Sequence, residues 1–130
     1  MMKSQKNSVL EKHPQRTAKV ALLTFFNITS AWGVKSEEQR VLLGNPATST
    51  LFKWKKGEVS KISIDTLERI SYVMGIYKAL GILFPTREQA DAWITKANDH
   101  FNGDTALDFM LKGSLVNLSD LRRYLDAQRG

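Results

Sequence analysis

Apolar side chains recur every three or four residues along almost the whole chain, and no run of five or more residues alternates like a half-buried strand. This spacing predicts an all-α protein. Glycines such as Gly33, Gly44 and Gly57 stand where helices are expected to stop. The predicted helices run from about 15 to 32, from 36 to 43, through 48–54, from about 63 to 84, through 86–97, from 105 to 113 and from about 117 onward.

Two of the predicted helices carry distinctive apolar surfaces. The first has one stripe, widened by Leu23 and Phe26, that consists of Ala18, Leu22, Phe25, Thr29 and Trp32. The long fourth helix is apolar over more of its circumference, at Leu67, Ile70, Val73, Met74, Tyr77, Leu80 and Phe84. A helix of this kind packs on two sides, so we expect it to form the seam between the two halves of the chain.

Three short sequences have the form of a capping box, in which side chains at a helix start satisfy free backbone N–H groups. They span 36–39, 86–89 and 105–108, and each predicts the start of a helix. The helices of the second half are expected to bury Ala90, Trp93, Ile94, Ala97, Leu118, Leu121 and Leu125.

The composition is that of an ordinary globular protein, with 42% hydrophobic and 25% charged residues among 130. Cysteine is absent, which excludes disulfides, thiolate metal sites and cysteine nucleophiles. The longest apolar stretches, 20–34 and 70–84, fall short of the roughly 18 apolar residues of a membrane span. Because the first 19 residues are polar and basic, unlike a signal peptide, the sequence predicts a cytoplasmic protein without membrane contact.

The net charge of +6 is concentrated in the first half of the chain. Residues 1–61 hold 11 Lys and Arg against 4 Asp and Glu, whereas residues 62–130 hold 8 against 9. This asymmetry favours contact of the first half with a polyanion, nucleic acid before membrane. A solvated basic tail is the alternative, because five of the positive charges are at Lys3, Lys6, Lys12, Arg16 and Lys19.

Residues 36–54 read as a helix, a glycine-containing turn and a second helix, the geometry of a helix-turn-helix DNA-binding element. Leu51 and Trp54 are expected to pack the second helix onto the body. Outward hydroxyls near its start can reach base edges or phosphates, and lysines can neutralise phosphates. The candidate DNA contacts are Thr48, Ser49, Thr50, Lys53, Lys55, Lys56 and Lys61. A plain pair of helices with a lysine-covered face would have the same pattern.

The chain offers no constellation typical of catalysis or metal binding. His13 and His100 are its two histidines, and neither has a second metal ligand three or four residues away. Asp104 and Asp108 are better explained by the start of a helix than by paired-carboxylate catalysis. Glycine-rich phosphate loops and G-x-S-x-G motifs are missing from the sequence. We therefore predict a binding protein with no catalytic residue, metal or cofactor.

Two stretches resemble known antitoxins. The run LGNPATSTLFKWKKG at 43–57, followed by IDTLERI at 64–70, resembles the Xre-like helix-turn-helix of bacterial type II antitoxins. Downstream, the pattern A-x-x-W at 90–93, the segment 98–101, GDTALDFMLxG at 103–113 and LRRYLD at 121–126 resemble the Xre/MbcA/ParS toxin-binding domain. The likeness covers about residues 17–130. The family usually has proline where this chain has Ala106, and that proline only preorganises the first helical turn.

The resemblance implies two helical parts, which we place at 1–70 for the basic tail and the Xre-like helix-turn-helix head and at 71–130 for a small toxin-binding domain. It also implies operator DNA, a homodimer within a toxin–antitoxin assembly, and a cognate RES-domain toxin that degrades NAD, or less often an ADP-ribosylating relative. In such pairs the end of the antitoxin lies at the mouth of the toxin's active site. The matching residues here are Arg122, Arg123, Asp126, Gln128, Arg129 and Gly130.

The sequence thus predicts a non-enzymatic antitoxin that blocks its toxin directly and represses its own operon. The alternative is a stand-alone helix-turn-helix transcriptional regulator whose C-terminal half is a dimerisation domain. Co-purification with a toxin encoded next to the chain would separate the two. An enzyme is disfavoured, because no nucleophile and base can be paired.

Overall fold

The computed structural model describes residues 14–130, and within them the regular elements are helices joined by loops. Predictions for Lys3, Lys6, Lys12 and His13 lie outside the described residues. No strand forms in the described part, where Ala97 and Thr105 make an isolated bridge, so the all-α prediction is confirmed there. The elements are α2 (Pro14–Ala31), α3 (Ser36–Leu42), α4 (Thr48–Lys55), α5 (Ile64–Leu83), α6 (Arg87–Trp93), the 3-10 helix η1 (Asp99–Phe101), α7 (Ala106–Met110) and α8 (Leu115–Gln128).

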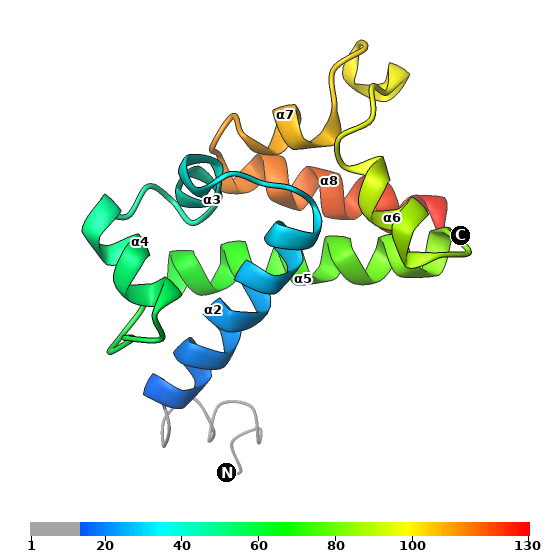
Figure 1. The fold of residues 1–130 in the computed structure, drawn as a ribbon. Helices are drawn as coiled ribbons and strands as arrows, with labels where there is room; N and C mark the ends of the chain where they lie inside the picture. The colour runs from blue at the N-terminus through cyan, green and yellow to red at the C-terminus, as the bar shows by residue number, and fades with distance from the viewer. Residues whose placement is uncertain (1–13) are drawn as a thin grey trace, which may run out of the picture.

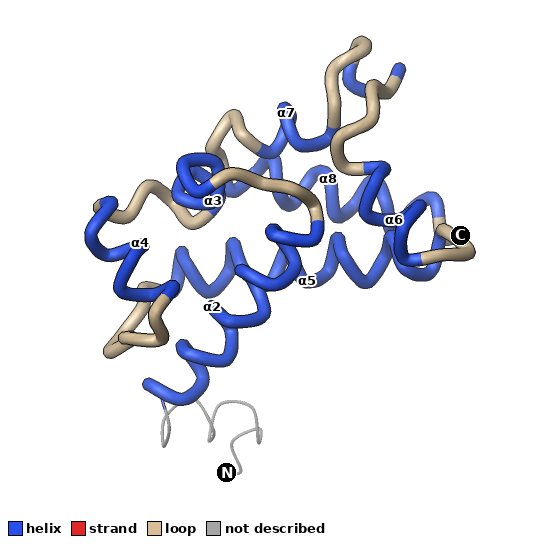
Figure 2. Tube along the Cα trace, viewed as in Figure 1, coloured by secondary structure: helices blue, strands red, loops and turns tan. Residues whose placement is uncertain are grey.

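The long helix α5 runs through the middle of the molecule, and most other elements are arranged around it (Figure 1). It packs against α2, α6 and α8, as expected for a helix that is apolar on two sides. The small helices α3 and α4 lie near its start and α6 lies near its end, with loops such as 56–63 between them (Figure 2). The predicted division between residues 70 and 71 falls inside α5, which continues through it without a break.

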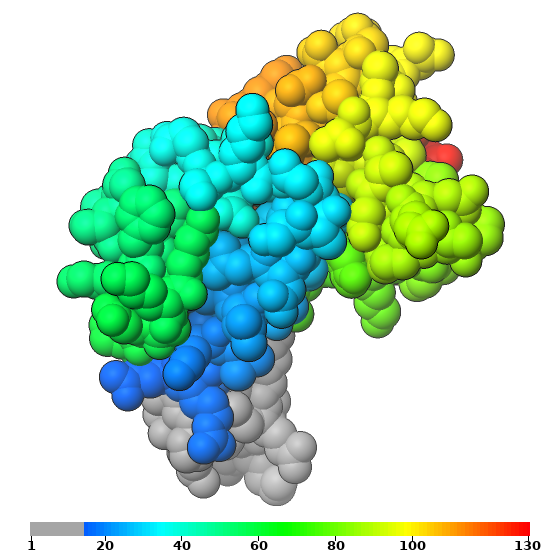
Figure 3. Space-filling view, in the orientation of Figure 1, coloured from blue at the N-terminus to red at the C-terminus, as the bar shows by residue number. Residues whose placement is uncertain are grey.

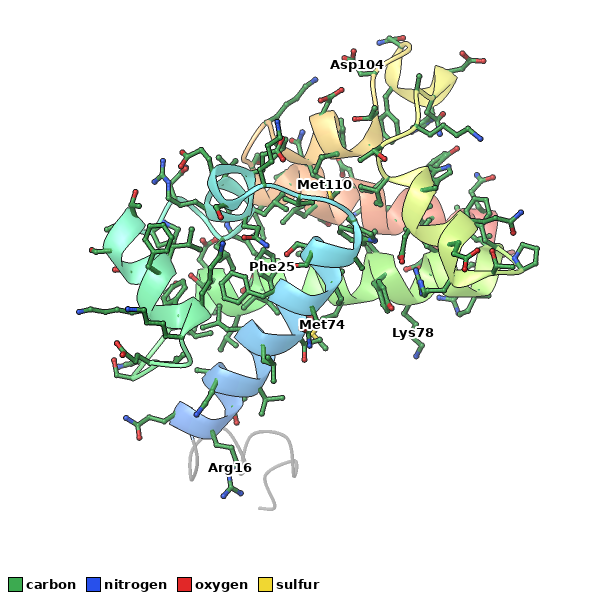
Figure 4. The ribbon with its side chains drawn as sticks, viewed as in Figure 1. Arg16, Phe25, Met74, Lys78, Asp104 and Met110 are labelled. Carbon is green, nitrogen blue, oxygen red and sulfur yellow. The ribbon has the colours of Figure 1, made fainter. Side chains whose placement is uncertain are left out.

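One continuous core joins the helices of both halves. Phe25 of α2, Leu51 of α4, Val73 of α5 and Leu121 of α8 are each at most 2% exposed and belong to the same cluster of buried side chains. Figure 4 shows Phe25 pointing into the space between α2 and α4, and Met110 lying between α7 and α8. Because the core is shared, the position of α8 is fixed relative to α2–α4 through α5.

The predicted apolar stripes are correct in the middle and wrong at their edges. The stripe from Ala18 to Trp32 is buried, but Leu23 is 60% exposed and Ile28 is buried in its place. On α5, Met74 is 41% exposed and Ile76 is fully buried. In both helices the buried face is shifted from the predicted stripe, because the positions of the neighbouring helices decide which part of the circumference is covered. Ala97 is exposed as well, since α6 ends at Trp93.

Two of the three predicted capping boxes mark helix starts as expected. The Thr86 hydroxyl accepts a hydrogen bond from the backbone N–H of Gln89 at 3.2 Å and starts α6. At α7, Thr105 and Asp108 satisfy each other's backbone N–H groups, at 3.0 and 3.2 Å. The box at Ser36 is wrong by one residue, since Lys35 is the cap and its N–H donates to Glu38 at 2.9 Å.

The side chain of Gln39 has a different role from the predicted cap. It is 3% exposed and donates from Nε2 to the Thr29 hydroxyl at 3.0 Å, which ties α3 to α2. The last helix also differs from its prediction, because Ser114 caps it and it begins at Leu115, two residues before Asn117.

Candidate functional site

The C-terminal end of α8 carries the six predicted toxin contacts. Arg122 and Asp126 are half-buried, and the other four are exposed: Arg123, Gln128, Arg129 and Gly130. The carboxylate of Asp126 accepts hydrogen bonds from Arg122 Nε at 3.1 Å and from Arg129 Nη1 at 3.3 Å. Arg123 instead lies 3.8 Å from Asp120. The structure therefore brings Arg122, Asp126 and Arg129 together and separates Arg123 from them.

Such partly exposed ion pairs add little to folding stability, because water screens the charges and the long side chains lose freedom. Here the ion pairs set the direction in which the charged side chains point. Asp126 lies between two guanidinium groups and holds both on one side of the last two turns of α8. The end of α8 thus presents two positive groups and one negative group on the same side.

Arg122 also makes a close approach to α5 at Gly75. A Cβ atom placed on Gly75 would lie 1.7 Å from Arg122 Nη1 and 2.3 Å from its Cζ. The guanidinium group therefore occupies the space that any other residue at position 75 would fill.

Gly75 also lines a cavity of about 500 Å³ between α2 and α5. The surface is hollowed where these two helices diverge (Figure 3), and Met74 lies there while Lys78 points away from α5 (Figure 4).

Aromatic side chains surround the other side of α8. His100 stacks on Tyr124 with ring centres 3.8 Å apart and planes 20° apart, and Phe101 contacts Phe109 at 5.1 Å. Next to Tyr124 there is a small cavity of about 220 Å³, lined by Leu83, Phe84, Trp93, Tyr124, Leu125 and Gln128. Flat aromatic surface beside oriented arginines is a combination typical of the centre of protein–protein interfaces.

The predicted DNA-binding residues lie on α4 and in the loop after it. Leu51 is buried and Trp54 half-buried, so these two side chains hold α4 onto the body as expected. The structure leaves Thr50 half-buried, and six candidates are exposed: Thr48, Ser49, Lys53, Lys55, Lys56 and Lys61. Lys56 and Lys61 lie in the loop 56–63, outside the helix that carries the other five.

The turn between α3 and α4 is held by hydrogen bonds and by two left-handed residues. Gly44 and Asn45 have φ values of 92° and 62°, and Arg40 donates from Nη1 to the carbonyl oxygen of Pro46 at 3.1 Å. Arg40 also pairs with Glu37, with Nη2 and Oε1 2.6 Å apart. Hydrogen bonding from Arg40 lowers the pKa of Glu37, and the pKa of Arg40 is raised in return.

Within residues 14–130 there is no group of three or more His, Cys, Asp or Glu side chains that could hold a metal ion. The same part of the chain has no helix that is both long enough and apolar enough to span a membrane.

Comparison with known proteins identifies the second half. Residues 79–130 match the family model described as the antitoxin Xre/MbcA/ParS C-terminal toxin-binding domain. Residues 79–130 therefore belong to this toxin-binding domain family. An uncharacterized protein, y4oB, from Sinorhizobium fredii (strain NBRC 101917 / NGR234) is 49% identical over 109 residues, which covers 84% of each chain. No solved structure matches the chain.

The Xre/MbcA/ParS domain accounts for the end of α5 and everything after it. The charged end of α8 and the aromatic side chains around Tyr124 lie inside the matched range, whereas α2, α3 and α4 lie before it. A toxin-binding domain implies a cognate toxin as partner, and domains of this family are typically non-enzymatic.

Some features of this antitoxin were not predicted from the sequence. The contact between Gly75 and Arg122 was missed, although a glycine inside a long apolar helix is a signal that something approaches the backbone closely. The stacking of His100 on Tyr124 was missed because the two residues are 24 positions apart and on different elements.

Proposed function

We propose that the chain neutralises a RES-type, NAD-degrading toxin by covering the toxin's active site with the end of α8, and that it represses its own operon through α3 and α4. The observation that carries the first part is the arrangement at the end of the toxin-binding domain. There Asp126 orients Arg122 and Arg129 close to the chain end.

This arrangement suits a site that accepts a charged dinucleotide. Guanidinium groups form paired hydrogen bonds with carboxylates, so Arg122 and Arg129 would pair with acidic side chains of the toxin. Tyr124 and the cavity beside it supply apolar surface for the rest of the contact. Occupation of the site by these groups would exclude NAD.

The second part is supported by the surface of α4. Thr48 and Ser49 are exposed at the helix start, where free N–H groups favour phosphate, and Lys53 and Lys56 are exposed further along. Repression by such an element needs two heads on two half-sites, which fits a dimer of the antitoxin.

Co-expression tests the proposal. The product of the neighbouring open reading frame is produced with and without this chain, and the complex is purified through a tag on this chain. We expect a stable complex, loss of cellular NAD when the neighbour is produced alone, and no loss when both are produced. A neighbour that does not bind contradicts the proposal and favours the stand-alone regulator. Binding without NAD loss contradicts the RES assignment.

A further inference from the structure

Two glycines lie inside α5, and each faces an arginine. A Cβ at Gly81 would lie 2.8 Å from Arg87 Nη1, a contact that a small shift of the side chain relieves. A Cβ at Gly75 would lie 1.7 Å from Arg122 Nη1, 2.3 Å from Cζ and 2.8 Å from Nε. Three atoms of the Arg122 head group are therefore too close, and the whole group would have to move.

Conformation does not explain the glycine at position 75. It lies in the interior of a 20-residue helix and is not among the residues with positive φ. Glycine is a much poorer helix former than alanine in such a position. Because glycine has no Cβ, it leaves space beside α5, and the guanidinium group of Arg122 occupies that space.

We infer that Gly75 is a positioning residue for the toxin contact, because it leaves the space in which Arg122 is held against α5. The inference rests on the proposed function, in which Arg122 meets the toxin. With Arg122 Nε directed at Asp126, the carboxylate is in turn directed at Arg129. One missing Cβ on α5 thereby orders three charged side chains at the end of α8.

A side chain that is already held loses less conformational freedom on binding than one that is free. Displacement of Arg122 by a methyl group at position 75 also breaks its hydrogen bond to Asp126, because Nε is among the atoms that must move. The effect on toxin affinity is then opposite to the effect on folding. Alanine favours the helix, whereas the freed arginine binds less well.

The test compares the full-length chain with its Gly75→Ala, Gly81→Ala, Arg122→Ala and Gly75→Ala/Arg122→Ala variants. The measurements are the dissociation constant for the purified product of the neighbouring open reading frame and the midpoint of urea unfolding. We expect Gly75→Ala to raise the dissociation constant about tenfold. Its urea midpoint stays equal to or above that of the unchanged chain. Gly81→Ala is the matched control, and its affinity should stay within about twofold because Arg87 is not a proposed toxin contact.

The double variant decides whether Gly75 acts through Arg122. In the Arg122→Ala background, Gly75→Ala should cause no further loss of affinity. Full affinity of Gly75→Ala together with weak binding of Arg122→Ala overturns the inference and leaves the proposed function standing. An equal loss from Gly75→Ala in both backgrounds also overturns it. If Arg122→Ala binds normally, the proposed contact itself is wrong and the inference falls with it.

Discussion

The ammonium group of Lys55 lies 2.6 Å from the hydroxyl oxygen of Ser36, so the end of α4 is bonded to the start of α3. Lys55 also lies 5.8 Å above the ring of Phe26 on α2. It therefore contributes to the geometry of the α3–α4 pair as well as to its charge. Lys53 and Lys56 are exposed on the same stretch. A test of DNA binding is cleaner on these two, because charge reversal there spares the Ser36 contact.

Reversing the charge at Lys53 and Lys56 should weaken operator binding and flatten its salt dependence. Each lost phosphate contact reduces the magnitude of the slope of log K against log salt by about 0.9. The magnitude of the slope for the Lys53→Glu/Lys56→Glu variant should therefore be about 1.8 smaller. Fluorescence anisotropy with a DNA fragment from upstream of the operon measures both effects. The matched control, Lys96→Glu/Lys112→Glu, makes the same change of net charge in the second half and should retain the slope. Equal slopes in all three proteins would contradict DNA binding by α4.

Shortening the chain after Asp126 should abolish toxin neutralisation and leave DNA binding unchanged. Removal of residues 127–130 deletes Gln128, Arg129 and Gly130, while α8 keeps its buried residues. A growth assay with the toxin measures neutralisation, and the salt titration described for α4 measures DNA binding. Intact neutralisation by the shortened chain would rule out occlusion by the C-terminal end.

The point of truncation matters because Leu125 is 1% exposed and belongs to the core. A cut that removes Leu125 would confuse loss of the contact with loss of the fold. Leu125→Ala shows the difference, since it should lower the free energy of unfolding by about 2–5 kcal/mol. Urea unfolding of the chain shortened after Asp126 should instead match that of the full chain.

The contrast between Leu125 and Arg122 illustrates what could be predicted from the sequence. Leu118, Leu121 and Leu125 were predicted to be buried because helical spacing puts them on one face, and the structure confirms it. Spacing along one helix says nothing about which partner helix comes close to it. The contact of Arg122 with Gly75 and the stacking of His100 on Tyr124 depend on tertiary packing, so the local pattern could not give them.

The cap at Lys35 was missed for a related reason. Ser36 and Gln39 fit the capping pattern, but Gln39 lies on the face that packs against α2, and its hydrogen bond to Thr29 is made in the core. The sequence pattern predicts a capping role for Gln39, whereas burial against α2 gives its side chain another partner. The helix then starts one residue earlier, with Glu38 reaching the Lys35 N–H.

Replacement of Thr29 by valine should destabilise the fold more than the same change at Thr24. Both hydroxyls donate to the carbonyl oxygen four residues before them, at 2.9 Å. The Thr29 hydroxyl also accepts the hydrogen bond from Gln39, and valine would leave that buried amide without its acceptor. We expect a loss of about 1–3 kcal/mol for Thr29→Val. The loss for Thr24→Val should be about 0.5 kcal/mol or less, by urea unfolding. Equal losses would contradict a role for the Thr29–Gln39 pair.

Ala106→Pro should stabilise the toxin-binding domain. Ala106 is the first residue of α7, after the Thr105 cap, where proline fits the backbone and its missing N–H is not needed by the helix. Proline reduces the conformational freedom of the unfolded chain, so the free energy of unfolding should rise by about 0.4–1 kcal/mol. Leu107→Pro is the contrasting variant, because the Leu107 N–H donates to the carbonyl oxygen of Ile94 at 3.0 Å and its side chain is 8% exposed. That change should cost about 1–3 kcal/mol from the unpaired carbonyl alone. The midpoint temperature of thermal unfolding measures both effects. A lower midpoint for Ala106→Pro as well as for Leu107→Pro would contradict the predicted gain at the first position of α7.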